Sequence, residues 1–192
     1  MSNLFAGLVT SKTRIKILIR LFLNDESSSY LRELAKEFNV SSNAVREELN
    51  QLMSARLLKS CKNGRQVYYT ANQNHPLFNE LKSMVRKVMG IDQVIEGIIN
   101  RLGDVQSAYL IDDYAEGKDS GIIDLLLVGN IDRYHLDDLS RKTERYINRT
   151  IRTIVLTPAE LRPFFEKFES RPHLLIWQAG SVPDKPENNK DQ

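Results

Sequence analysis

Apolar residues recur every three or four positions in three short stretches near the start of the chain, and this spacing predicts three amphipathic helices. The stretches cover residues 12–23, 30–38 and 43–55. Their apolar faces consist of Ile15, Leu18, Ile19 and Phe22, then Leu31, Leu34, Ala35 and Phe38, then Ala44, Val45, Leu49, Leu52 and Met53. Residues 24–29 form a polar break, and residues 39–42 predict a tight turn whose serine caps the third helix.

The pattern then changes to two short β-prone runs, residues 57–61 and 66–70, joined by residues 62–65. Asn63 and Gly64 predict a hairpin here, because both residue types accept the positive φ of a tight turn. Helix, helix, turn, helix and hairpin within about 60 residues is the layout of a winged helix-turn-helix. We expect this module to span residues 1–74.

Residues 75–102 form the most apolar helical segment, either one long helix or two helices broken at Gly90. A helix this apolar is not expected to stand alone in water. Two roles stay open: it packs between two modules, or it pairs with a second copy of the chain. Regulators with winged helices read two half-sites as dimers, so we expect a homodimer.

A second module is expected over residues 103–180. Residues 105–111 and 122–128 are β-branched, continuous apolar runs, as expected for strands buried on both faces. Further strands are expected at residues 151–156 and 173–177, and helices at 136–147 and after the capping box of residues 157–160. Residues 181–192 are rich in proline and charge and predict a disordered tail. The fold class is therefore α+β.

Composition limits the class of protein, the cellular compartment and the kind of partner that we expect. The chain of 192 residues has one cysteine, Cys61, which excludes an internal disulfide and is expected to be a partly buried free thiol. No apolar run is long enough to cross a membrane, and no secretory signal is visible, so we expect a cytoplasmic protein. Residues 1–90 hold 14 basic and 7 acidic residues, whereas residues 91–192 hold 13 and 18. The basic half is the candidate for a polyanionic partner.

Residues 30–72, YLRELAKEFNVSSNAVREELNQLMSARLLKSCKNGRQVYYTAN, resemble the winged helices of the ArsR/MarR-like regulators nearly throughout. Arg56 departs from the family pattern, because it stands where a glycine is common before Leu57. That departure concerns a turn rather than the residues facing DNA. The resemblance implies a prokaryotic, sequence-specific regulator that binds double-stranded DNA.

The third helix is expected to enter the major groove. Its candidate base contacts are Ser42, Asn43, Arg46 and Asn50, with arginine able to read guanine and asparagine adenine. The hairpin would contact the backbone or the minor groove through Lys62, Asn63, Arg65 and Gln66. Lys12, Arg14 and Lys16 are candidate phosphate contacts, while Glu47 and Glu48 oppose non-specific binding.

Residues 108–132, AYLIDDYAEGKDSGIIDLLLVGNID, together with the junction TPAEL, resemble the minimal nucleotidyltransferase fold. The resemblance implies a Gly-Ser loop for nucleotide phosphates and an Asp-x-Asp pair for magnesium. Here Asp112 and Asp113 stand in place of Gly-Ser, and Ile122 replaces one carboxylate, leaving Asp124. We therefore expect a disabled active site with no cofactor and no metal. Asp112, Asp113 and Asp124 are only weak candidates for binding a cation.

The hypothesis is thus a DNA-binding regulator whose second module senses an unidentified small-molecule effector or sets assembly, acting through residues 75–102. One alternative is an active nucleotidyltransferase that docks on a partner through its winged helix. Another is an interaction module of a toxin–antitoxin or repair assembly.

Overall fold

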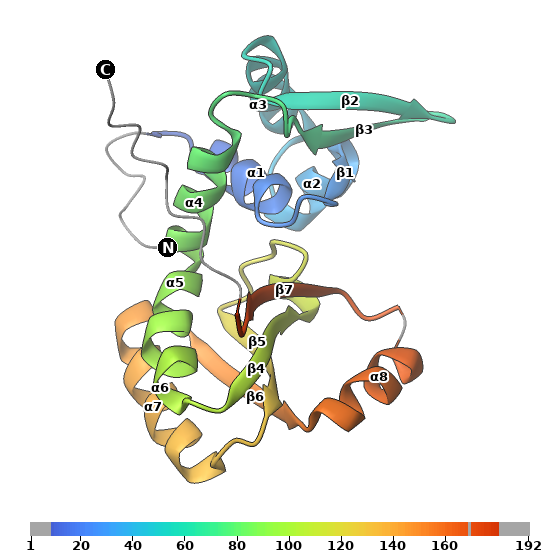
Figure 1. The fold of residues 1–192 in the computed structure, drawn as a ribbon. Coiled ribbons are helices and arrows are strands. Elements are labelled where there is room, and N and C mark those ends of the chain that lie inside the picture. Colours follow the sequence, from blue (N-terminus) through green and yellow to red (C-terminus); the bar gives the residue numbers. More distant parts are fainter. Residues whose placement is uncertain (1–8, 169, 181–192) are drawn as a thin grey trace, which may run out of the picture.

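The computed structural model describes residues 9–168 and 170–180, which form two modules joined by a helical linker (Figure 1). The predicted tail at residues 181–192 lies outside the described residues. No helix in the described ranges is long and apolar enough to cross a membrane.

The N-terminal module contains helices α1 (Lys12–Phe22), α2 (Leu31–Phe38) and α3 (Ser42–Ser54), with strands β1 (Ser28–Tyr30), β2 (Leu58–Asn63) and β3 (Gln66–Ala71). The strands form an antiparallel sheet in the order β1-β3-β2. Ser41 caps α3, since its hydroxyl accepts a hydrogen bond of 3.2 Å from the backbone N–H of Ala44. This order and pairing confirm the predicted winged helix-turn-helix.

Two local expectations were wrong in this module. Residues 28–30 pair with β3 as a third strand, whereas Ser28 and Ser29 were expected in a polar break and Tyr30 at the start of the second helix. The hairpin turn consists of Gly64 and Arg65 rather than Asn63 and Gly64, because Asn63 pairs with Gln66 as the last residues of the ladder. Only Gly64 of these takes a positive φ, of 59°. Arg56 takes a φ of 59° as well, the left-handed conformation that favours glycine.

The linker is broken at Gly90, the second of the two predicted arrangements, with a φ of 78°. Before the break lies α4 (Phe78–Met89); after it come α5 (Ile91–Val94), a π-helical turn η2 (Ile95–Ile99) and α6 (Asn100–Leu102). Helix α4 packs on α1, whereas α5 and η2 pack on α7 of the second module. Most of the apolar residues that suggested pairing with a second copy are therefore buried or partly buried within this chain, although Leu77 is exposed.

The C-terminal module contains strands β4 (Val105–Ile111), β5 (Ile122–Gly129), β6 (Thr150–Leu156) and β7 (His173–Gln178), helices α7 (Arg133–Ile147) and α8 (Pro158–Lys167), and a short 3-10 turn η3 (Asp112–Tyr114). The sheet order is β6-β5-β4-β7, and only β5 and β6 run parallel. The linker and α7 cover one face, and α8 covers part of the other (Figure 1). Accordingly β5 is buried on both faces, but the edge strand β6 is half-exposed.

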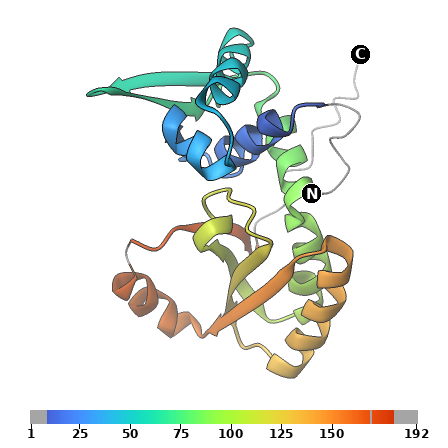
Figure 2. The same cartoon turned by 180° about the vertical axis from the view of Figure 1, so that it is seen from behind.

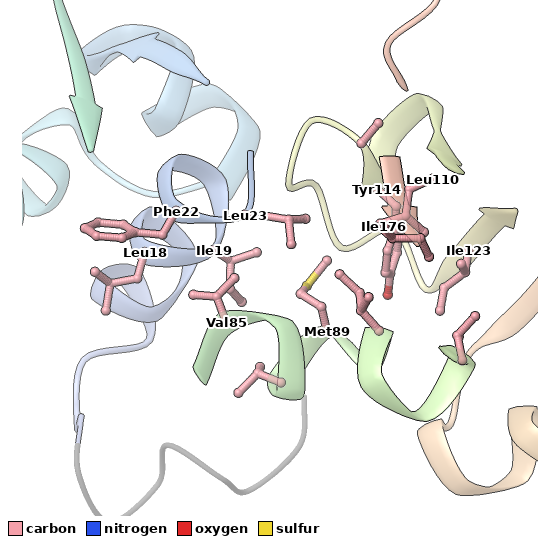
Figure 3. Packing of buried hydrophobic residues seen from close by; sticks show 14 of the residues in the cluster. Leu18, Ile19, Phe22, Leu23, Val85, Met89, Leu110, Tyr114, Ile123 and Ile176 are labelled. Carbon is pink, nitrogen blue, oxygen red and sulfur yellow. The ribbon is translucent and has the colours of Figure 1, made fainter. Parts of the chain in front are cut away.

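One hydrophobic core runs through both modules. Phe22 of α1 and Leu110 and Tyr114 of the C-terminal module are buried in the same cluster as Val85 and Met89 of the linker. In Figure 3 the side chain of Met89 lies between those of α1 and those of the C-terminal module. The linker is therefore an interdomain packing element as well as a connection.

Candidate nucleic-acid interface

Helix α3 buries Val45, Leu49 and Leu52 and turns a polar face to solvent. The predicted contact residues Ser42, Asn43, Arg46 and Asn50 are all exposed on it. This face lies at the end of the molecule away from the C-terminal module, with α1 and α2 between them (Figures 1 and 2). A DNA duplex could therefore reach α3 without meeting the second module.

Arg46 is held in place by its neighbour on the helix. Its Nη1 donates a hydrogen bond of 2.8 Å to Oδ1 of Asn43, one turn earlier. The bond restricts the guanidinium but leaves its other N–H groups available, and a guanidinium has five donors in all. A prepositioned arginine loses less conformational entropy on binding than a free one.

Two of the predicted phosphate contacts have partners inside the protein. Arg14 donates to Glu48 at 2.7 Å and also bonds Gln51, so it joins α1 to α3. Lys16 donates to the carbonyl oxygen of Phe38 at 3.3 Å. Arg14 and Lys16 are thus structural contacts rather than free cations. The pairing also neutralises Glu48, which leaves Glu47 as the acidic residue on the exposed face of α3.

The β2–β3 hairpin extends from the module as a two-stranded wing (Figure 1). Lys62, Asn63, Arg65 and Gln66 are exposed at its tip. Gln66 accepts a hydrogen bond of 3.0 Å from the hydroxyl of Tyr68. Cys61 is exposed on β2 rather than partly buried as predicted, because the wing has no core behind this part of the strand.

The three aspartates expected in the C-terminal loop do not form a metal site. Asp112 is bound by Arg171 through bonds of 2.8 and 2.6 Å, and Asp124 by Arg152 through two bonds of 2.6 Å. The hydrogen bonds from Arg171 lower the pKa of Asp112. Within the described ranges no group of three or more His, Cys, Asp or Glu residues could hold a metal ion. The carboxylates of Asp112 and Asp124 are engaged by arginines, so these two do not fit magnesium.

Asp112 also has an unusual backbone, with a φ of 58°. This is a left-handed conformation that glycine adopts without strain and aspartate adopts less readily. The position aligned with the glycine of the nucleotidyltransferase loop thus has a glycine-like backbone, although its side chain is charged. Arg152 lies beside Asp124 in the parallel register of β5 and β6. The sequence comparison did not predict this ion pair.

A buried ion pair that the sequence did not reveal supports the 112–121 loop. Arg149 donates to both carboxylate oxygens of Asp119, at 3.1 and 2.8 Å, and to the carbonyl oxygens of Ile147 and Val88. The hydroxyl of Tyr114 donates to Asp119 at 2.7 Å. These bonds join the loop, the end of α7 and the last turn of α4.

Comparisons with known proteins give fold-level likeness only. No family model matches the chain, and no curated protein matches it. Solved structures that resemble it include reduced HlyU from Vibrio cholerae (22% identity, 46% of this chain and 84% of that chain, TM-score 0.36). Others are the adhesin competence repressor AdcR from Streptococcus pyogenes (23%, 52% and 70%, TM-score 0.37) and the transcriptional regulator BldR from Sulfolobus solfataricus (16%, 51% and 70%, TM-score 0.35). With scores this low, the winged-helix assignment rests on the element order and sheet register described above.

Proposed function

We propose that this protein is a sequence-specific, double-stranded DNA-binding transcriptional regulator. The observation that carries the proposal is the exposed polar face of α3, where Asn43 holds Arg46 at 2.8 Å beside a protruding basic wing. An α-helix of this kind fits the major groove, and its side chains meet base edges there. The C-terminal module lies on the opposite side of the winged helix and leaves this face open.

The residues have distinct roles in this proposal. Arg46 reads guanine through O6 and N7, and Asn50 reads adenine. Ser42 lies in the first turn of α3, close enough to the helix start to contact a backbone phosphate. The wing residues Lys62, Asn63, Arg65 and Gln66 contact the DNA backbone or the flanking minor groove.

Selection of bound sequences from random duplexes tests the proposal directly. A defined site should be enriched at low salt, and Arg46→Ala should weaken binding to it by about 1–3 kcal/mol. Arg162→Ala is the matched control, because it removes the same charge from an exposed position on α8. The absence of any enriched sequence would refute the proposal.

The C-terminal module fits a degenerate nucleotidyltransferase-like fold acting as a sensing or assembly module. Supporting this, β5 runs parallel to β6 and antiparallel to β4, and the acids nearest the implied active site are engaged by Arg152 and Arg171. We expect no nucleotide incorporation with labelled triphosphates and Mg²⁺. Incorporation that Asp124→Asn abolished would favour the alternative, an active enzyme.

The proposal also includes the oligomeric state, the cellular compartment and an effector. A homodimer would read a palindromic operator, and selection would reveal such symmetry in the enriched sites. Because the linker is buried inside the chain, the dimer contact would use another surface. A cytoplasmic regulator of this kind could respond to a small-molecule effector.

A further inference from the structure

A basic hollow opens at the C-terminal end of α7, on a part of the second module to which the proposed DNA contacts do not extend. The hollow is shallow and largely open to solvent, with a volume of about 510 Å³. Its walls include three arginines, Arg141, Arg145 and Arg149, together with Glu144, Thr150 and the backbone at Gly121. These walls are polar, which suits a charged ligand better than an apolar one.

Two of the arginines, Arg141 and Arg145, make no hydrogen bond or ion pair with any described residue. They lie one turn apart on α7, and like charges at this spacing destabilise a helix. Asp138, the acid one turn before Lys142, is bound to Lys142 at 2.6 Å and interacts with Arg141 only through longer-range electrostatics. An anion placed between Arg141 and Arg145 would remove the repulsion.

The acid in the hollow is already engaged. Glu144 accepts a hydrogen bond of 2.6 Å from the backbone N–H of Ile151, where β6 begins. Arg149 is fixed at the rim by its two bonds to Asp119. Glu144 keeps its negative charge, because its partner is a neutral N–H, but the two guanidiniums of α7 outweigh it. Guanidinium groups bind phosphoryl oxygens in bidentate fashion.

We propose that this hollow binds a small molecule carrying a diphosphate or two adjacent phosphate groups, held by Arg141 and Arg145. Two guanidiniums one turn apart fit two phosphoryl groups better than one. Arg149 lines the hollow and connects it to the rest of the chain, because its guanidinium holds Asp119 and the carbonyl oxygen of Val88. A bound anion competes with Asp119 for Arg149, and so loosens the 112–121 loop.

Isothermal titration of the full chain with inorganic pyrophosphate, without DNA or added metal, tests the site. We expect saturable binding, weakened at least tenfold in the double variant Arg141→Gln/Arg145→Gln. The control Arg133→Gln/Arg162→Gln removes the same charge from exposed positions on α7 and α8, and should bind within twofold of the unmodified protein. Asp119→Asn should bind several-fold more tightly, because it removes a negative charge beside Arg149.

Other outcomes overturn the proposal. One is that pyrophosphate shows no saturable binding to the unmodified protein. Another is that both double variants lose the same amount of pyrophosphate affinity. A third is that Arg141 and Arg145 are needed to bind a single-stranded oligonucleotide but not to bind pyrophosphate. Circular dichroism of each variant establishes that it is folded. The measurement contains no DNA, so failure here leaves the proposed function of α3 intact, and failure of DNA selection leaves this site intact.

Discussion

The backbone of Gly117 lies directly against the carbonyl oxygen of Ile19 in α1. A Cβ on Gly117 would stand 2.8 Å from that oxygen, and the φ of Gly117 is 76°. Nearby, Nδ2 of Asn24 donates to the carbonyl oxygen of Ala115 at 3.3 Å. The 112–121 loop thus gives the C-terminal module a second, non-covalent contact with the winged helix. Coupling between the modules need not pass through residues 75–102 alone.

Gly117→Ala should destabilise the protein by about 2–3 kcal/mol, through an unfavourable φ and the close contact with α1. Gly103→Ala is the matched control, because Gly103 has a φ of 81° with nothing within 4 Å of the added Cβ. Gly103→Ala should lower the free energy of unfolding only through its unfavourable φ, by about 1 kcal/mol. Urea unfolding measures both. Equal losses would mean that the approach to Ile19 contributes nothing to stability.

Asp119→Asn should lower the free energy of unfolding at neutral pH by about 3 kcal/mol, because Arg149 is left buried without its partner. Burial raises the pKa of Asp119, but the hydrogen bonds from Arg149 and Tyr114 outweigh it and hold the pKa below its ordinary value. The ionised pair therefore stabilises the fold fully above the unfolded-state pKa, and the stabilisation is lost as the pH falls through the folded-state pKa.

Urea unfolding at a series of pH values checks this. The variant should lose less stability than the unmodified protein as the pH falls below about 4, the ordinary pKa of an aspartate, towards the lower folded-state pKa of Asp119. Asp138→Asn, which removes an exposed carboxylate, should change the profile little. An unchanged acid dependence in Asp119→Asn would contradict the role assigned to the pair.

Asn43→Ala should weaken binding to a selected DNA site, in part because Arg46 loses the acceptor that positions it. Asn43→Ala, Arg46→Ala and the double variant form a double-mutant cycle. If the two residues act together, the double variant loses less binding free energy than the sum of the two single losses. Competition titrations at fixed salt give the three affinities. Strict additivity would show that Asn43 contacts DNA independently of Arg46.

Arg56→Gly should raise the free energy of unfolding by up to about 1 kcal/mol, because a left-handed φ strains a residue with a side chain and not glycine. The hydrogen bond of 2.8 Å from Asn72 to the backbone carbonyl of Arg56 is kept in the variant. Arg56→Ala retains the strain and should show no such gain. A similar gain in both variants would trace the effect to the loss of charge.

Most helices and strands could be predicted because each has a clear apolar period. Strand β1 could not, since Ser28, Ser29 and Tyr30 carry no such pattern and become a strand only by pairing with β3. The hairpin turn was displaced by one residue for a similar reason. Asn63 and Gly64 suit a turn locally, but the ladder register places Asn63 opposite Gln66.

The apolar pattern of residues 75–102 correctly predicted a buried helix face. Such a pattern does not indicate whether another part of the chain or a second copy packs against that face. The exposed face of α3 was predictable from polar spacing on one helix. The pairing of Arg14 with Glu48, and of Arg149 with Asp119, joins residues 34 and 30 positions apart and leaves no local signal. Such contacts decide which charged residues are free to bind a partner.

The core that runs from α1 through Met89 to Tyr114 has a thermodynamic consequence. Since neither module can lose its packing without exposing apolar surface of the other, the chain should melt in one calorimetric transition, with equal van't Hoff and calorimetric enthalpies. A ligand bound anywhere on the C-terminal module would then raise the melting temperatures of the winged helix and of the C-terminal module by the same amount. The two modules are one cooperative unit of folding.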